Sequence, residues 1–457
     1  MQIKNPADGS LLRDVPADAG EAVGHKATAA RMAQPEWARR GFAKRAACLE
    51  KFAVLLVERR EALAQTLTCE TGKPISQARN ELKGLSERLE FFLRETPAEL
   101  ATETVATRDT GTEEQIRLEP LGVVANISAW NYPYFVGANV FVPALLTGNA
   151  VLYKPSEYAT LTGLAIAELL GDAGVPANVF STLVGGGDTG RALLEQPIDG
   201  MFFTGSYATG SKIAEALANR MMRVQLELGG KDPAYVCDDV DPVAAAAALA
   251  DGAFYNTGQS CCAVERIYVH ERVWQPFIDA FVATVQGFSL GDPLKDDTYI
   301  GPLARRELAL ADLAAQVKDA LDKGARVLTG GQRVDRPGFY FQPTVIVDVD
   351  HKMQVMSQES FGPIIGLMQV RSDDEAMQLM ADTEYGLTAA VFSSDKARAE
   401  GILSELDVGT AYWNCCDRVS PRLPWSGRRH SGMGCTLSSY GISTFLKPKA
   451  WHLRGPS

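Results

Sequence analysis

Cysteine and histidine are scarce in this chain. It has eight cysteines and five histidines in 457 residues, too few and too scattered for a disulfide scaffold or a zinc site. Two cysteine pairs, Cys261/Cys262 and Cys415/Cys416, are directly adjacent, which suits structural disulfides poorly. We therefore expect free thiols in a reducing, cytoplasmic location, and no metal site.

A surplus of positive charge is also missing. Lys and Arg total 45 against 56 Asp and Glu, a net charge of −11, which argues against nucleic-acid and anionic-membrane partners. The N-terminus lacks the apolar segment of a secretory signal. Residues 120–153 carry no charge, but they contain Asn, Pro and Gly at intervals that suit a strand, a loop and a buried helix better than a membrane span.

What the chain does contain is a globular composition, 46% hydrophobic and 22% charged. The first hundred residues show helical stripes of apolar side chains. Short apolar runs then alternate with helical segments at 121–127, 150–153, 179–184, 201–203 and 224–228. This alternation is typical of a mostly parallel, doubly wound sheet, and it restarts beyond Gly229. We predict two doubly wound α/β domains.

Residues 102–120 break this pattern. The stretch is polar, rich in threonine and centred on Gly111, which predicts an exposed hairpin whose edges can pair with another chain. We expect it to serve in oligomerisation together with a C-terminal strand near 442–446.

Two segments carry residues suited to binding a cofactor. Gly205 and Ser206 follow an apolar run, where a strand-to-helix turn can hold a pyrophosphate, although the GxGxxG pattern is absent and an ordinary tight turn remains open. Lys154 and Glu157 follow another run, where a carboxylate can accept hydrogen bonds from ribose hydroxyls. A solvated pair at the start of a helix is the alternative.

Three further residues are candidates for catalysis. Glu227 ends an apolar strand before a Gly-Gly turn and is either a general base or a surface residue. Cys261 lies in a small polar turn, where a thiol can be accessible and activated, although most single cysteines are inert. Asn131 precedes a proline turn and can donate to an oxyanion or cap the next helix.

Taken together, the segments resemble a known family. The motifs AWNYPY, YKPSE, FTGSYATG, LELGGK, GQSC, QESFGP and GTAYWN occur in this order between residues 129 and 414. In this combination the chain resembles the NAD(P)-dependent aldehyde dehydrogenase superfamily over nearly its whole length. The resemblance implies an aldehyde-dehydrogenase-like α/β fold with a Rossmann-like cofactor-binding domain, a catalytic domain and a small β oligomerisation element.

The resemblance also implies roles for the catalytic candidates. Cys261 corresponds to the catalytic thiol, Glu227 to the general base and Asn131 to the oxyanion donor. The implied activity is oxidation of an aldehyde to the carboxylic acid through a thiohemiacetal and a thioester on the cysteine. Near the C-terminus, the segment that contains Cys435 and Thr436 departs from the common family pattern.

For the cofactor, the resemblance implies NAD, with NADP possible. Lys154 and Glu157 correspond to adenosine-ribose contacts, and Gly205 and Ser206 to the pyrophosphate loop. Glu359 corresponds to a ligand of the nicotinamide ribose, with Phe361 packed near it. The carboxylate of Glu157 favours NAD because it would repel a 2′-phosphate.

The implied substrate tunnel is largely aromatic and apolar, which favours a neutral aliphatic or aromatic aldehyde. Arg418 and Arg422 lie close in sequence to its wall and leave succinate semialdehyde as an alternative. The predicted wall residues are Tyr132, Phe135, Phe254, Cys262 and Trp425.

The expected organisation follows from these assignments. Residues 1–101 and 120–228 would form the NAD-binding domain, 229–436 the catalytic domain, and 102–119 with 437–457 the oligomerisation element. We expect a homodimer or homotetramer that acts on a small-molecule aldehyde. A CoA-acylating relative, a non-catalytic NAD-binding structural member and a cysteine hydrolase without redox chemistry are the alternatives.

Overall fold

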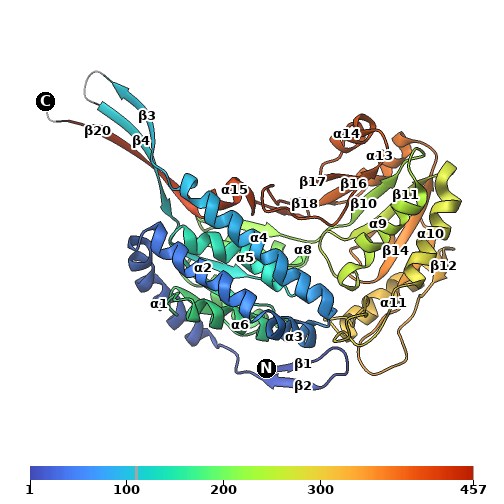
Figure 1. The fold of residues 1–457 in the computed structure, drawn as a ribbon, viewed down its shortest axis with the longest axis horizontal. Helices are drawn as coiled ribbons and strands as arrows, with labels where there is room; N and C mark the ends of the chain where they lie inside the picture. Colours follow the sequence, from blue (N-terminus) through green and yellow to red (C-terminus); the bar gives the residue numbers. More distant parts are fainter. Residues whose placement is uncertain (109–111, 456–457) are drawn as a thin grey trace.

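The computed structural model describes residues 1–108 and 112–455. Two open, mostly parallel sheets form the body of the molecule, and a narrow three-stranded arm projects from one side (Figure 1). The predicted α/β fold with two doubly wound sheets is confirmed.

Helices fill most of the first hundred residues, as the periodicity predicts: α1 (Gly20–Arg39), α2 (Phe42–Glu58), α3 (Arg60–Thr71) and α4 (Ile75–Glu99). On α2 the stripe Leu49, Phe52 and Leu56 is fully buried. A hairpin of β1 (Gln2–Lys4) and β2 (Leu11–Asp14) precedes the helices. The sequence did not predict this hairpin, because it has little apolar alternation: Ile3 is buried whereas Leu11 is exposed.

The first sheet has the strand order β19-β9-β8-β5-β6-β7. Its strands are β5 (Val123–Ile127), β6 (Ala150–Lys154), β7 (Phe180–Thr182), β8 (Gly200–Thr204), β9 (Arg223–Glu227) and the short antiparallel β19 (Gly432–Met433). The connecting helices are α5 (Pro133–Leu146), α6 (Thr160–Asp172), α7 (Gly187–Leu194) and α8 (Tyr207–Leu217). Because β5 to β9 are parallel, the residues that follow them gather at one edge of the sheet.

The second sheet has the order β12-β13-β14-β11-β10-β16-β17. Its strands are β10 (Asp232–Val236), β11 (Val264–His270), β12 (Arg326–Thr329), β13 (Thr344–Val347), β14 (Ile364–Val370), β16 (Thr388–Phe392) and β17 (Thr410–Trp413). Covering helices include α9 (Pro242–Phe254), α10 (Trp274–Gln286), α11 (Glu307–Asp322), α13 (Asp373–Ala381) and α14 (Lys396–Ser404) (Figure 1). Strand β10 is buried along its whole length, as expected for a central parallel strand.

The arm consists of β3 (Glu103–Arg108), β4 (Thr112–Pro120) and β20 (Leu446–Arg454), all antiparallel. The predicted hairpin is therefore present, although Gly111 at its centre lies outside the described residues. The predicted strand near 442–446 was wrong: residues Ser438–Ser443 form helix α15, and the strand begins only at Leu446. Leu437, Gly441 and Ile442 are all buried, a spacing that fits a helical turn.

The uncharged stretch 120–153 is not a membrane helix; it forms β5, α5 and β6 inside the first sheet. Within the described ranges, no helix has the length and apolar character needed to cross a bilayer.

Candidate active site

The candidate nucleophile Cys261 lies in a turn between the short helix η1 (Tyr255–Gly258) and β11, as predicted. Gly258 has φ 70°, and a Cβ atom there would meet the Gly362 carbonyl oxygen at 2.3 Å. Only glycine tolerates this backbone and this approach, so the path into the turn is fixed. The Cys261 side chain is partly buried.

Asn131 follows β5 and is nearly fully buried. Its backbone is tied to the Cys261 turn by a residue that the sequence analysis did not single out. The side-chain amide of Asn256 donates to the Asn131 carbonyl oxygen at 3.2 Å and to the Gln259 carbonyl oxygen at 2.9 Å. The structure therefore brings Asn131 and Cys261 to one place, with Asn256 as the clamp between their two turns.

Glu227 ends β9 and is buried. The hydroxyl of Thr436 donates a hydrogen bond to its Oε1. Burial raises the pKa of Glu227 to about 7, although the Thr436 hydrogen bond acts in the opposite direction. A carboxylate with a pKa close to neutrality is suited to general-base work.

The Gly-Gly turn after Glu227 touches the nucleophile turn. A Cβ atom on Gly230 would lie 2.9 Å from the Cys261 carbonyl oxygen. The N–H of Gly230 donates to Glu359 Oε1 at 3.2 Å. Glu227, Cys261 and Glu359 are thus held around one short segment of backbone.

At the predicted adenosine end of the site, Lys154 ends β6 and Glu157 follows it. Lys154 is buried, its Nζ donates to the Pro155 carbonyl oxygen at 3.2 Å, and it lies 4.0 Å from Glu157 Oε2. Burial lowers the pKa of Lys154. The Glu157 side chain is 46% exposed. The buried ammonium group of Lys154 can donate to a ribose hydroxyl, and the accessible carboxylate of Glu157 can accept from one. The pair therefore fits a ribose that carries two hydroxyls.

The predicted pyrophosphate loop lies at the same sheet edge. Gly205 donates its N–H to the Glu227 carbonyl oxygen at 3.0 Å. Ser206 is the N-cap of α8, and its hydroxyl accepts a hydrogen bond from the Thr209 N–H. The N-terminus of α8 is suited to a phosphate group, so these residues fit a dinucleotide.

Glu359 and Phe361 lie near the catalytic turns. Burial raises the pKa of Glu359 to about 8. The Phe361 ring meets the Trp130 ring edge to face, with centroids 5.4 Å apart. Since Trp130 directly precedes Asn131, the predicted nicotinamide-ribose residues and the predicted oxyanion donor are neighbours.

The predicted substrate wall is assembled in part. Tyr132 and Phe135 stack with ring centroids 6.0 Å apart, and Cys262 and Trp425 are buried in a hydrophobic cluster that also contains Phe135. Phe254 is elsewhere. It ends α9 and packs against Phe281 and Phe288 in the core of the second sheet.

Charged residues that the sequence analysis missed lie beside this wall. Asp417 Oδ1 accepts from Ser260 Oγ at 3.1 Å and from Cys262 Sγ at 3.0 Å. Burial raises the pKa of Asp417 to about 6. Arg88 of α4 is also buried here. Its position between the buried residues Leu85 and Phe92 of α4 was the sequence signal that could have identified it.

The two arginines that the sequence did single out are not part of the buried wall. Arg418 and Arg422 are both exposed. Across the described residues, no group of His, Cys, Asp and Glu side chains is arranged to hold a metal ion.

Comparison with known proteins identifies the family. The profile of the Aldehyde dehydrogenase family matches residues 1–451. Succinate-semialdehyde dehydrogenase [NADP(+)] of Deinococcus radiodurans is 36% identical over 446 residues, which cover 97% of this chain and 93% of that protein. The chain belongs to the aldehyde dehydrogenase family.

Solved structures agree with this assignment. An Escherichia coli NADP-dependent enzyme superposes with a TM-score of 0.96 at 32% identity, covering 99% of this chain and 94% of the other. PnpE in complex with nicotinamide adenine dinucleotide gives the same TM-score, identity and coverage. The chain is an NAD(P)-dependent oxidoreductase that acts on aldehydes.

Proposed function

We propose that this enzyme oxidises its aldehyde through covalent catalysis by Cys261, with Asn131 as the oxyanion donor and Glu227 as the general base. The observation that carries the proposal is the convergence of three turns. Asn256 joins the Asn131 and Cys261 turns, and Gly230 lies against the Cys261 carbonyl oxygen.

The first half of the reaction uses the thiol and the oxyanion donors. Cys261 Sγ, as thiolate, forms a bond to the aldehyde carbon, and the carbonyl oxygen becomes an oxyanion. The Asn131 amide and the Cys261 backbone N–H are the donors proposed for this oxygen. Removal of one such donor costs on the order of 10²–10³ in rate. The bound cofactor supplies the hydride acceptor, and loss of hydride from the carbon leaves a thioester on Cys261.

The second half belongs to Glu227. The carboxylate takes a proton from water, the resulting hydroxide adds to the thioester carbon, and the carbon–sulfur bond breaks to release the acid and restore the thiol. The pKa of Glu227, raised to about 7 by burial, supports this role.

Glu157 supports NAD as the preferred cofactor. Its half-exposed carboxylate lies beside Lys154 at the end of β6, where it can accept from both hydroxyls of a ribose and repels a 2′-phosphate. The aromatic pair Tyr132 and Phe135 accommodates the hydrocarbon part of the aldehyde and underlies the expectation of a neutral substrate, with succinate semialdehyde as the alternative.

The arm supports assembly into a homodimer or homotetramer. Its outer strands β3 and β20 leave backbone hydrogen-bonding groups at both edges of the sheet, and Val105 and Ile116 are exposed apolar residues on it.

Two variants test the catalytic assignment. Cys261→Ser should abolish NADH formation, whereas Cys48→Ser, a matched change on α2, should not affect it. Glu227→Gln should retain a burst of about one NADH per active site, followed by slow turnover because thioester hydrolysis is impaired. Full steady-state activity of Cys261→Ser would refute the proposal.

A further inference from the structure

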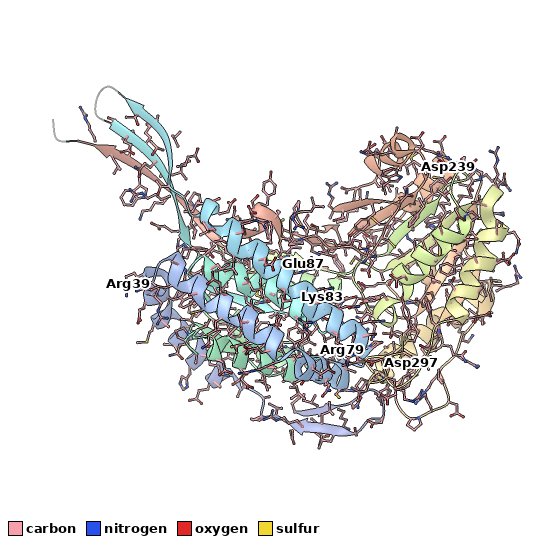
Figure 2. All side chains as sticks on the ribbon, viewed as in Figure 1. Arg39, Arg79, Lys83, Glu87, Asp239 and Asp297 are labelled. Carbon is pink, nitrogen blue, oxygen red and sulfur yellow. The ribbon has the colours of Figure 1, made fainter. Side chains whose placement is uncertain are left out.

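Arg88 is buried on its helix, as is Glu81, whereas the other charged residues of α4 reach the surface. Arg79, Lys83 and Glu87 follow one another on the accessible side of α4 (Figure 2), whereas Arg88 is only 4% exposed. Its neighbours on the buried face are Leu85 and Phe92, both fully buried. Arg88 therefore occupies a position on the buried face of α4 where the helical pattern predicts an apolar residue.

A hydrogen bond and an aromatic ring fix the position of the Arg88 guanidinium. Arg88 Nη1 donates to Asn139 Oδ1 at 2.6 Å, and the group lies over the Phe135 ring at 4.0 Å from its centroid. Gly84, one turn earlier on α4, makes room for this ring, since a Cβ atom there would lie 2.7 Å from Phe135 Cζ. Asn139 and Phe135 thus fix a planar donor group beside the predicted substrate wall.

Arg88 has no carboxylate partner of its own. Two buried lysines of the chain are directly paired, Lys73 with Glu81 and Lys231 with Glu265. In the part of the chain that the structure describes, no ion pair involves Arg88, and Asn139 is its one hydrogen-bond partner. A buried cation without a directly paired counter-ion is costly, and an anion that pairs with it offsets part of this cost.

The guanidinium also belongs electrostatically to the active site. Burial lowers its pKa to about 10, against the opposing influence of Glu81, Glu227 and the two thiols Cys262 and Cys261. It therefore remains charged at neutral pH. Lys73 lies over the Tyr132 ring, so each ring of the Tyr132–Phe135 stack has one cation against it. Lys73 is ion-paired with Glu81, whereas Arg88 forms no direct ion pair within the described residues.

We propose that Arg88 determines specificity by binding the carboxylate of an aldehyde that carries an anionic group at its far end. Among the described residues only Nη1 has a hydrogen-bond partner, which leaves the Nε and Nη2 groups as the parallel N–H donors that bind carboxylates in pairs. This inference rests on the proposed function, because it places the aldehyde carbon at Cys261. It favours the anionic alternative, of which succinate semialdehyde is an example, over a neutral aldehyde. It assigns to Arg88 the role that the exposed Arg418 and Arg422 do not fill.

The test uses shape-matched substrate pairs. One pair is 4-carboxybenzaldehyde and 4-isopropylbenzaldehyde, and the other is 4-oxobutanoate and 4-methylpentanal. For the wild type, we expect kcat/KM to be at least tenfold higher for the anionic member of a pair. Arg88→Met should lower this ratio on the order of 10²-fold, mainly through KM, because a buried charged contact is lost. Arg88→Lys should restore part of it, since a point charge replaces the planar donor group.

The matched control is Arg94→Met on the same helix, where the arginine is exposed and pairs only with its neighbour Glu95. It should leave the ratio unchanged. Inhibition of the wild type tests the binding of an anionic group without variants. Glutarate should compete with the aldehyde, whereas the neutral pentanamide at equal concentration should not.

Three results would contradict either the role of Arg88 or the proposed function, and they can be told apart. A wild type that prefers the neutral member of both pairs overturns the carboxylate assignment and leaves the proposed function intact. Equal losses for both members in Arg88→Met, with slower alkylation of Cys261 by iodoacetamide, would mean that Arg88 stabilises the thiolate instead. The absence of NADH with every aldehyde would refute the proposed function itself.

Discussion

The hydroxyl of Thr436, in the segment that follows β19, donates a hydrogen bond to the carboxylate of Glu227 at the end of β9. Both side chains are buried. Thr436 belongs to the segment that departs from the common family pattern, so an unusual residue contacts the proposed general base directly. A donor to the charged form of a carboxylate lowers its pKa, so this contact lowers the proton affinity of Glu227 against the larger effect of burial.

Thr436→Val should shift the pH dependence of turnover. Without the donor, the pKa of Glu227 rises further above its value of about 7. Less of the base is then deprotonated at neutral pH, so the acidic limb of kcat should move to higher pH by about one unit, and the rate should recover in alkaline solution. The measurement is kcat against pH under conditions where thioester hydrolysis limits the rate.

The control for this variant is Ser439→Ala, an exposed position three residues further along. Its pH profile should match the wild type. A Thr436→Val enzyme that loses activity equally at every pH would show that the threonine supports the fold of the turn and does not tune Glu227.

Asn256→Gly should uncouple the two catalytic turns. The variant keeps the left-handed backbone of Asn256, φ 54°, but removes both amide hydrogen bonds to the Asn131 and Gln259 carbonyl oxygens. Each buried carbonyl left without a donor costs about 1–3 kcal/mol. We expect a lower melting temperature and a loss of kcat on the order of 10-fold to 10²-fold.

Asn80→Ala provides the comparison for Asn256→Gly. Asn80 is exposed and reaches only the hydroxyl of Tyr255, next to the same turn. Normal activity in Asn256→Gly, even with reduced stability, would contradict the clamp.

The fold was largely predictable because its signals are local. Apolar runs such as 150–153 become fully buried parallel strands, and the periodic stripe on α2 becomes a buried helix face. The error at 442–446 is of the same local kind. A short apolar segment suits either a helix or a strand, and only the tertiary packing of Gly441 and Ile442 decides between them.

The sequence predicted those site residues that lie in a recognisable motif at the end of a strand or in a turn. Cys261, Glu227 and Asn131 are found at strand ends and turns that the pattern locates. Asn256, Arg88 and Asp417 contribute through contacts between segments far apart in sequence, for example Arg88 with Asn139 and Asp417 with Ser260. Hydrophobic periodicity contains no information about such pairs. Phe254 shows the converse, since an aromatic residue close in sequence to Cys261 is committed to another core.

The arm should carry the subunit contacts. Deletion of residues 448–457 removes most of β20, which pairs with β4 along its whole length. We expect the wild type to be a dimer or tetramer by light scattering and the deletion variant to be a monomer. NAD binding should persist in the monomer, because Lys154, Gly205 and Glu359 belong to the body of the molecule and not to the arm. An unchanged assembly would place the interface elsewhere.

Glu157→Gln should weaken the preference for NAD. The carboxylate is half-exposed and 4.0 Å from Lys154, so it can approach the ribose hydroxyls, and its charge opposes the 2′-phosphate of NADP. Glutamine keeps the length and a hydrogen-bonding oxygen while removing the charge. We expect kcat/KM with NADP to rise about tenfold relative to NAD, an electrostatic difference of roughly 1.4 kcal/mol. Because repulsion between charges is screened by salt, this gain should shrink as ionic strength increases.

Glu168→Gln on the exposed side of α6 changes the net charge equally and should leave the cofactor ratio as it is. If both variants behave alike, Glu157 does not contact the ribose, and cofactor choice depends on other residues.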